Sequence, residues 1–285
     1  MTHRTRFLAL GYAAGLLMFT AGCREKYRMN QVAVEYQPLR SASEIRPLTS
    51  LLVDPVLYTN AVSLGYLPTA EQKQKFIDLM LPAILVVKFN LEQKQARIRD
   101  LAGKQRRKKA WTREDSLFIA EELTRYRAKN IRQLARKVKP HPVSLVLAQA
   151  ALESGWGTSN CFAEANNVFG VWSLRADEER IETSARRGGR KVFLRRYRNL
   201  SLSVEHYYET LGRVAAYRDF RNIRFENDNP YALLPQLSAY SELGHTYTRR
   251  LRSVIRDNRL TRYDRYRINP VYLSRNQHWQ AFAPY

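Results

Sequence analysis

A single glutamate, Glu153, closes an apolar segment and is followed at once by Ser-Gly-Trp-Gly. Apolar residues between Val143 and Ala151 recur three and four apart, which predicts a buried helix that ends at Gly155. The unpaired carbonyl groups at a helix C-terminus and the neighbouring Trp156 both disfavour a negative charge, so we expect the pKa of Glu153 to be raised. A carboxyl group that keeps its proton near neutral pH suits the general acid of glycoside hydrolysis.

The elements that must hold this glutamate in place are mostly helical. Apolar residues follow a helical spacing from residue 69 to about 101, where Pro82 is expected to kink or divide the helix. Two strands, 180–184 and 191–197, flank a Gly-Gly turn and predict a small β-hairpin. Further helices are expected to begin after Thr112 and to cover 202–215, 230–237 and 247–258. The predicted fold class is therefore mainly α, a helical catalytic domain with one small β-hairpin.

The N-terminus has the pattern of a secretion signal. Arg4 and Arg6 precede a mostly apolar run at 7–19 that is too short to span a bilayer, and small residues then lead to Cys23. We expect residues 1–22 to be a lipoprotein-type signal peptide and Cys23 to be lipidated, which would anchor the protein to a membrane. Ordinary cleavage after a small residue is the alternative.

Differences in composition and pattern divide the rest of the chain into four predicted segments. Residues 23–50 are polar, basic and interrupted by prolines, which predicts a tether. A helical extension is expected over 51–138, and a basic aromatic tail over 262–285. The catalytic domain is expected between them, over 139–261.

The net charge of +22 predicts attraction to polyanions, among them nucleic acid, anionic lipid and acidic cell-wall polymer. No nucleic-acid-binding motif is present, and the export signal argues further against a nucleic-acid partner. The five histidines show no metal-ligand spacing, so we expect neither a metal nor a cofactor. Cys161 has no histidine near it in sequence and is interpreted as a packing residue.

Two segments give the chain a family resemblance. Residues 148–159, Ala-Gln-Ala-Ala-Leu-Glu-Ser-Gly-Trp-Gly-Thr-Ser, and residues 166–171, Asn-Asn-Val-Phe-Gly-Val, resemble the signature of the glucosaminidase family of peptidoglycan hydrolases, glycoside hydrolase family 73. A looser similarity covers about 140–260. Within the family, residues 217–221 and the arginine-rich helices most resemble the Gram-negative subgroup called Bax. The resemblance implies a lysozyme-like α+β fold, with substrate in a groove between the helices and the hairpin, and a periplasmic location.

The resemblance also implies roles for particular residues. Glu153 becomes the general acid. Glu182 is nearest to the place of the family's second carboxylate on the hairpin, with Glu178 and Glu179 as rivals. Tyr240 matches a family tyrosine whose hydroxyl faces the groove, although the glycine that precedes it in relatives is absent here.

Five further residues are expected at the substrate. Trp156 and Phe169 are interpreted as walls of the cleft, and Tyr247 as a substrate-binding residue of the matching downstream segment. Asn166 and Asn167 either bond sugar hydroxyls or cap a turn, and the sequence leaves both readings open.

The implied activity is that of an endo-β-N-acetylglucosaminidase that hydrolyses β-1,4 glycosidic bonds of peptidoglycan glycan strands. A muramidase or a lytic transglycosylase would use the same Glu153 on the other glycosidic bond. A non-catalytic peptidoglycan-binding lipoprotein is the alternative from another class. The second catalytic group could be a nucleophile, a base that activates water, or the substrate's own N-acetyl group.

Overall fold

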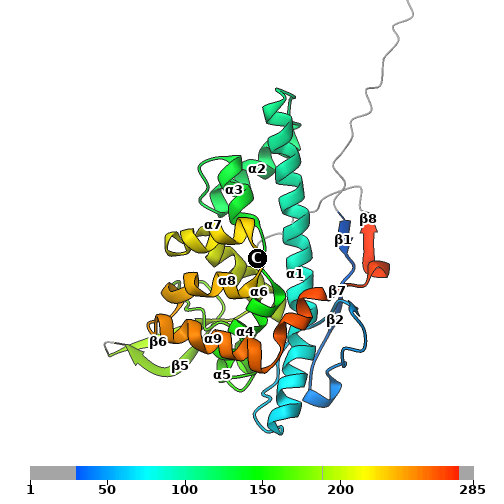
Figure 1. Cartoon of the computed structure of the whole chain (residues 1–285). Coiled ribbons are helices and arrows are strands. Elements are labelled where there is room, and N and C mark those ends of the chain that lie inside the picture. The colour runs from blue at the N-terminus through cyan, green and yellow to red at the C-terminus, as the bar shows by residue number, and fades with distance from the viewer. Residues whose placement is uncertain (1–29, 188, 276–285) are drawn as a thin grey trace, which may run out of the picture.

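The computed structural model describes residues 30–187 and 189–275, and one long helix, α1 (Thr69–Arg106), runs through it (Figure 1). Helices α3, α4 and α6 pack against α1. Pro82 lies inside α1, and the helix is continuous there, so of the two expected outcomes, a kink or a division, the division does not occur. Nearly every residue from Phe76 to Val87 is buried, so tertiary packing on both sides of the proline holds the two halves together.

The remaining helices form the body beside α1. Thr112 caps α2 through the reciprocal hydrogen bonds of a capping box with Asp115, as its position in the sequence predicts. The predicted helix at 230–237 is α-helical only over its first four residues and continues as a 3₁₀ helix. The helices are α2 (Arg113–Arg125), α3 (Ile131–Val138), α4 (Val143–Ser154), α5 (Asn160–Ala165), α6 (Leu200–Arg213), α7 (Arg218–Glu226), α8 (Pro230–Leu233) and α9 (His245–Asp257), with 3₁₀ helices η1 (Ala42–Glu44), η2 (Ala215–Tyr217), η3 (Leu234–Tyr240), η4 (Leu260–Arg265) and η5 (Pro270–Tyr272).

The predicted hairpin is present. Strands β5 (Arg180–Arg187) and β6 (Arg190–Arg195) pair antiparallel, with a register shift between Glu182 and Arg186. The hairpin projects from the helical body (Figure 1). A mainly α fold with one projecting hairpin confirms the predicted fold class.

The expected tether and tail are folded segments where the structure describes them. Strand β1 (Asn30–Val32) pairs with β8 (Leu273–Arg275), and β3 (Leu52–Val53) pairs with β7 (Arg267–Ile268). A third pair joins β2 (Glu35–Gln37) and β4 (Val56–Tyr58). Apolar residues in both segments explain the difference, because Leu39, Ala42, Ile45, Tyr263 and Ile268 are buried.

The predicted signal peptide and Cys23 lie outside the described residues. Over 30–187 and 189–275, no helix is both long enough and apolar enough to cross a bilayer.

The expected boundary at residue 138 does not separate two cores. Ile84 of α1 and Ala148 of α4 belong to the same cluster of buried apolar side chains, which extends into α6 and α9. The predicted helical extension therefore supports α4, the helix that carries Glu153, from one side.

Candidate active site

Helix α4 holds Glu153 in its last turn. Its residues from Val143 to Ala151 are all buried, so the helix has little freedom to move. Gly155 ends it with a left-handed φ of 60°, as predicted. A Cβ atom at Gly155 would lie 2.6 Å from the hydroxyl of Thr158, so both conformation and space require glycine there.

The carboxyl group of Glu153 is partly buried and accepts one side-chain hydrogen bond from the residues that the structure describes. The Tyr247 hydroxyl, from α9, donates to its Oε1 atom at 2.8 Å. Burial raises the pKa of Glu153, and the bond from Tyr247 partly offsets that rise. The predicted direction of the pKa shift is confirmed, with removal from water as its main cause.

Phenol groups surround this carboxyl group. Tyr240 of η3 stacks on Tyr247, and Tyr217 of η2 lies against Tyr240 with ring centroids 6.2 Å apart. Burial first, and the charge of Glu153 second, raise the pKa values of Tyr240 and Tyr217. Within the described part of the chain, no cation forms an ion pair with Glu153. The carboxyl group therefore lies in surroundings that favour its neutral form.

A buried row of hydrogen bonds continues behind Tyr247. Nε2 of Gln149 donates to the Tyr247 hydroxyl oxygen at 3.0 Å, and the Tyr207 hydroxyl donates to Oε1 of Gln149. Nε2 of His141 lies 2.9 Å from the Tyr207 hydroxyl. The exposed fractions of these four side chains are between 0% and 3%. We refer to His141, Tyr207, Gln149 and Tyr247 as the buried relay.

Three members of the buried relay, Gln149, Tyr207 and His141, were not among the predicted site residues. One signal was present, because Gln149 precedes Glu153 by four residues and must share its helix face. Tyr207 and His141 join the row only through tertiary contacts of Tyr207 with His141 and Gln149, which no local pattern reports. The Tyr247 hydroxyl donates to Glu153, and its predicted role in substrate binding stays a prediction.

Phe169 and Trp156, the two residues predicted to form walls of the cleft, pack against different parts of the protein. Phe169 is buried and stacks on Tyr207 with ring centroids 4.3 Å apart, so it supports the relay from one side. Trp156 packs edge-on against Phe76 of α1, and the ammonium group of Lys73 lies over its indole ring. The partners of Trp156 therefore give it a packing role between α4 and α1.

The structure favours turn capping over sugar binding for both asparagines. The Asn166 side chain accepts from the Ala61 amide and donates to the carbonyls of Thr59 and Tyr197. Asn167 binds main-chain groups of Val171 and Arg195 in the same way. Both side chains are buried with their polar atoms occupied by backbone, so neither presents a free group to a sugar.

Glu182 lies on the exposed hairpin, opposite Phe193. Its carboxylate pairs with Lys191 at 2.8 Å and with Arg186 at 3.3 Å. The bond from Lys191, followed by that from Arg186, lowers the pKa of Glu182. Neither carboxyl group is a cause of the other's pKa shift, and the pKa values of Glu182 and Glu153 are displaced in opposite directions.

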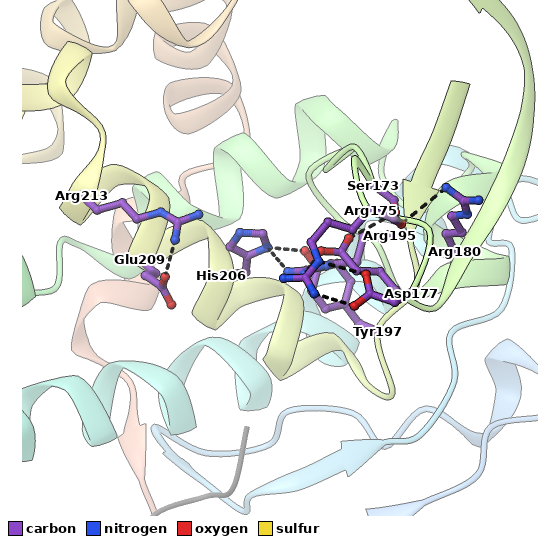
Figure 2. A network of polar contacts seen from close by, with 10 residues as sticks. Ser173, Arg175, Asp177, Arg180, Arg195, Tyr197, His206, Glu209 and Arg213 are labelled. Carbon is purple, nitrogen blue, oxygen red and sulfur yellow. Dashed lines mark hydrogen bonds and ion pairs between the residues drawn. The ribbon is translucent and has the colours of Figure 1, made fainter. Parts of the chain in front are cut away.

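The rival Glu178 anchors the base of the hairpin. It accepts hydrogen bonds from Arg195 at 2.6 Å and from Ser173 at 3.1 Å. Figure 2 shows how the network continues from Arg195 to His206 of α6, whose Nδ1 atom lies 2.6 Å from the Tyr197 hydroxyl. Glu178 therefore has a structural partner on each oxygen, whereas the other rival, Glu179, is exposed.

Cys161 fits the packing role that its sequence context predicts. Its thiol donates to the Asn167 carbonyl, and burial raises its pKa to about 11. A thiol that keeps its proton at neutral pH is a poor nucleophile.

Residues 128–260 match the family model described as Glucosaminidase: Mannosyl-glycoprotein endo-beta-N-acetylglucosaminidase. The chain contains a glucosaminidase-family glycoside hydrolase domain. Glu153, the hairpin and α9 all lie inside the matched segment, whereas α1 precedes it.

Two solved structures show similarity to this chain. The catalytic domain of the autolysin Auto from Listeria monocytogenes is 20% identical with a TM-score of 0.37, and the match covers 54% of this chain and 98% of that one. A C-terminally truncated glycoside hydrolase domain of FlgJ from Salmonella typhimurium is 24% identical with a TM-score of 0.34, covering 49% of this chain and 96% of that one. No curated protein sequence matches the chain.

Proposed function

We propose that this protein is an endo-β-N-acetylglucosaminidase that hydrolyses β-1,4 glycosidic bonds in peptidoglycan glycan strands, with Glu153 as its general acid. The observation that carries the proposal is the state of Glu153. Its carboxyl group is partly buried among phenols, has no ion-pair partner in the described chain, and has a raised pKa. A neutral carboxyl group at the working pH can give its proton to a leaving sugar oxygen.

The chemistry proceeds through loss of the leaving sugar. Glu153 gives its proton to the glycosidic oxygen as the bond from that oxygen to the anomeric carbon breaks, which leaves positive charge on the sugar ring. Glu182 is the proposed second carboxylate, because Lys191 and Arg186 keep it ionised, as a base or charge stabiliser must be. A water molecule then adds to the anomeric carbon, and the proton that it loses returns to the Glu153 carboxylate, by way of Glu182 where Glu182 acts as the base, which restores the acid.

The proposed substrate agrees with the charge of the chain. A net charge of +22 attracts a polymer that carries carboxylates on its lactyl groups and stem peptides. We propose the same location as the sequence predicts: export to the periplasm of a Gram-negative bacterium, with a lipid on Cys23. The narrower resemblance to the Bax subgroup remains a prediction.

A second candidate is a muramidase or lytic transglycosylase that uses the same acid on the other glycosidic bond. One observation favours it: among the described residues no other carboxylate contributes to the pKa shift of Glu153, and Glu182 forms ion pairs with two cations. A lone acid suits a reaction in which the substrate supplies the second group.

Product analysis separates these activities. Purified sacculi are digested with protein that lacks residues 1–22, and the new ends are identified by mass spectrometry. Reducing N-acetylglucosamine ends are expected. Reducing N-acetylmuramic acid would indicate a muramidase, anhydro ends a transglycosylase, and no product a binding protein.

The acid is tested in the same assay with Glu153→Gln, which is expected to lower the rate by at least about 100-fold. Glu164→Gln is the matched control, since Glu164 is an exposed carboxylate on the neighbouring helix α5. Digestion by Glu153→Gln at the rate of this control would exclude Glu153 as the acid.

A further inference from the structure

The buried relay has a direction. A phenol has one O–H to donate, a neutral histidine has one N–H, and the two ends of an amide have opposite roles. With Tyr207 donating to Oε1 of Gln149, the Tyr207 oxygen accepts from Nε2 of His141. Nε2 of Gln149 donates to Tyr247, which leaves the Tyr247 hydroxyl free to donate to Glu153. Each bond of the row thus points toward Glu153.

The opposite direction is chemically possible, and it would disable the acid. If the Gln149 amide were turned over, Tyr247 would donate to Gln149 and its oxygen would need a donor. The other hydrogen-bond partner of the Tyr247 hydroxyl is Glu153, which would then have to donate in its protonated form, so that its proton would point at Tyr247 instead of at a substrate. The direction of the row therefore decides which carboxyl oxygen of Glu153 carries the proton.

His141 lies at the far end of the row and sets this direction through its tautomer. Its ring is buried against Tyr208 and Phe220, and Nδ1 has no hydrogen-bond partner among the described residues. Burial and the nearby Arg224 cation lower the pKa of His141 well below its usual value, so the ring stays neutral with one proton. A proton on Nε2 gives the direction described; a proton on Nδ1 would leave a buried donor unpaired and let the row reverse.

We propose that His141, Tyr207 and Gln149 are positioning residues that keep Tyr247 a donor to Oε1 of Glu153, so that the acid's proton is held on Oε2 for the leaving sugar. This inference rests on the proposed function only in that Glu153 is the acid. It assigns a role in the reaction to three residues that touch neither the substrate nor the reacting atoms.

Tyr207→Phe tests the proposal. The substitution removes both relay bonds of Tyr207 and retains the ring that stacks on Phe169. The Gln149 amide can then turn and accept from Tyr247, so kcat should fall by about 10-fold to 100-fold at nearly unchanged KM. Loss of the bond to the carboxylate should also raise the pKa of Glu153 and move the basic limb of the kcat/KM profile to higher pH. Tyr247, Tyr240 and Tyr217 are the titratable groups that face Glu153.

Tyr208→Phe is the matched control. It removes a hydroxyl that is equally buried and bonds the backbone carbonyl of His141, outside the row. We expect it to leave kcat and the pH profile as in the wild type. If Tyr207→Phe loses no more activity than Tyr208→Phe at equal melting temperature, or if its pH profile does not move, the positioning role is excluded.

A second measurement does not depend on a variant that folds. Nitrogen-15 NMR of the histidine-labelled wild-type protein distinguishes the two neutral tautomers of His141. The proposal requires the proton on Nε2. A proton on Nδ1 would overturn it even if Glu153 proves to be the acid, and an inactive Glu153→Gln with an Nε2 proton on His141 would support both.

Discussion

The rings of Tyr240 and Tyr247 lie nearly parallel, with 13° between their planes and centroids 5.5 Å apart, yet only one of the two hydroxyls binds Glu153. The Tyr240 hydroxyl makes no hydrogen bond within 30–187 and 189–275, although its ring is packed by three other tyrosines. Its pKa is raised by burial and by the charge of Glu153, so the phenol is neutral and able to donate. One stacked tyrosine thus holds the acid, and its neighbour retains an unused donor beside it.

Tyr240→Phe should therefore lower activity and leave the fold intact. No protein hydrogen bond is lost, so the melting temperature should change little. If the hydroxyl binds the substrate or the charge that develops on it, kcat/KM on sacculi should fall by about 10-fold or more. A variant with the wild-type kcat/KM would assign Tyr240 a packing role only.

Glu153 should destabilise the fold at neutral pH. Its pKa in the folded state is raised above the value of 4.5 for an exposed glutamate, so the folded protein binds this proton more tightly than the unfolded chain. Stability is therefore lost as the pH rises through 4.5 and up to the raised pKa. Glu153→Gln should have a higher melting temperature than the wild type at about pH 7, and an equal one at about pH 3.5. A lower melting temperature at pH 7 would contradict the raised pKa.

The parts of the fold that local patterns specify could be predicted from the sequence. Thr112 and Gly155 marked helix ends, because a side-chain cap and a left-handed residue are local requirements. Continuity of α1 through Pro82 could not be predicted, since the burial that holds it is tertiary. The pairing of β3 with β7 was missed for the same reason: two-residue strands more than 200 positions apart leave no periodicity.

The same distinction between local and tertiary information applies to the candidate site. The position of Glu153 at a helix end and the direction of its pKa shift follow from neighbours in sequence. Asn166 could not be assigned, because an asparagine that bonds sugar and one that bonds main chain look alike until their partners are known. Gln149 was overlooked although its four-residue spacing from Glu153 was visible. Its role depends on a hydrogen bond to Tyr247, which lies nearly 100 residues away in the sequence.

Glu182→Gln tests the second carboxylate. Glu182 is exposed, so the loss of its two ion pairs should hardly change the melting temperature. If it stabilises the sugar cation or activates water, kcat should fall by about 100-fold. Glu164→Gln is again the control, as an exposed carboxylate on α5 without an ion pair among the described residues. Wild-type kcat for Glu182→Gln would leave the N-acetyl group of the substrate as the second group.

Asn166→Ala should lower stability and spare the chemistry. Its side chain joins Thr59 and Ala61 to Tyr197, and its left-handed φ of 50° suits asparagine better than alanine. Loss of these bonds should lower the free energy of unfolding by about 2–4 kcal/mol, with an unchanged kcat per folded molecule. Asn160→Ala, at an exposed position in α5, should change neither the stability nor kcat. A large rise in KM for Asn166→Ala at unchanged stability would restore the sugar-binding interpretation.

His206 should make the anchor of the hairpin sensitive to acid. Burial, with the charges of Arg195 and Arg213, lowers its pKa from 6.5 to about 4, while Glu178 opposes this shift and Tyr197 contacts its Nδ1. The unfolded chain therefore binds a proton at His206 before the folded protein does, and stability is lost as the pH falls from about 6.5 to about 4. His206→Gln has no such proton to bind, so its melting temperature should fall less over that range, whereas a substitution of the exposed His245 should leave the fall unchanged. Equal falls for wild type and His206→Gln would show that His206 is not buried in its neutral form.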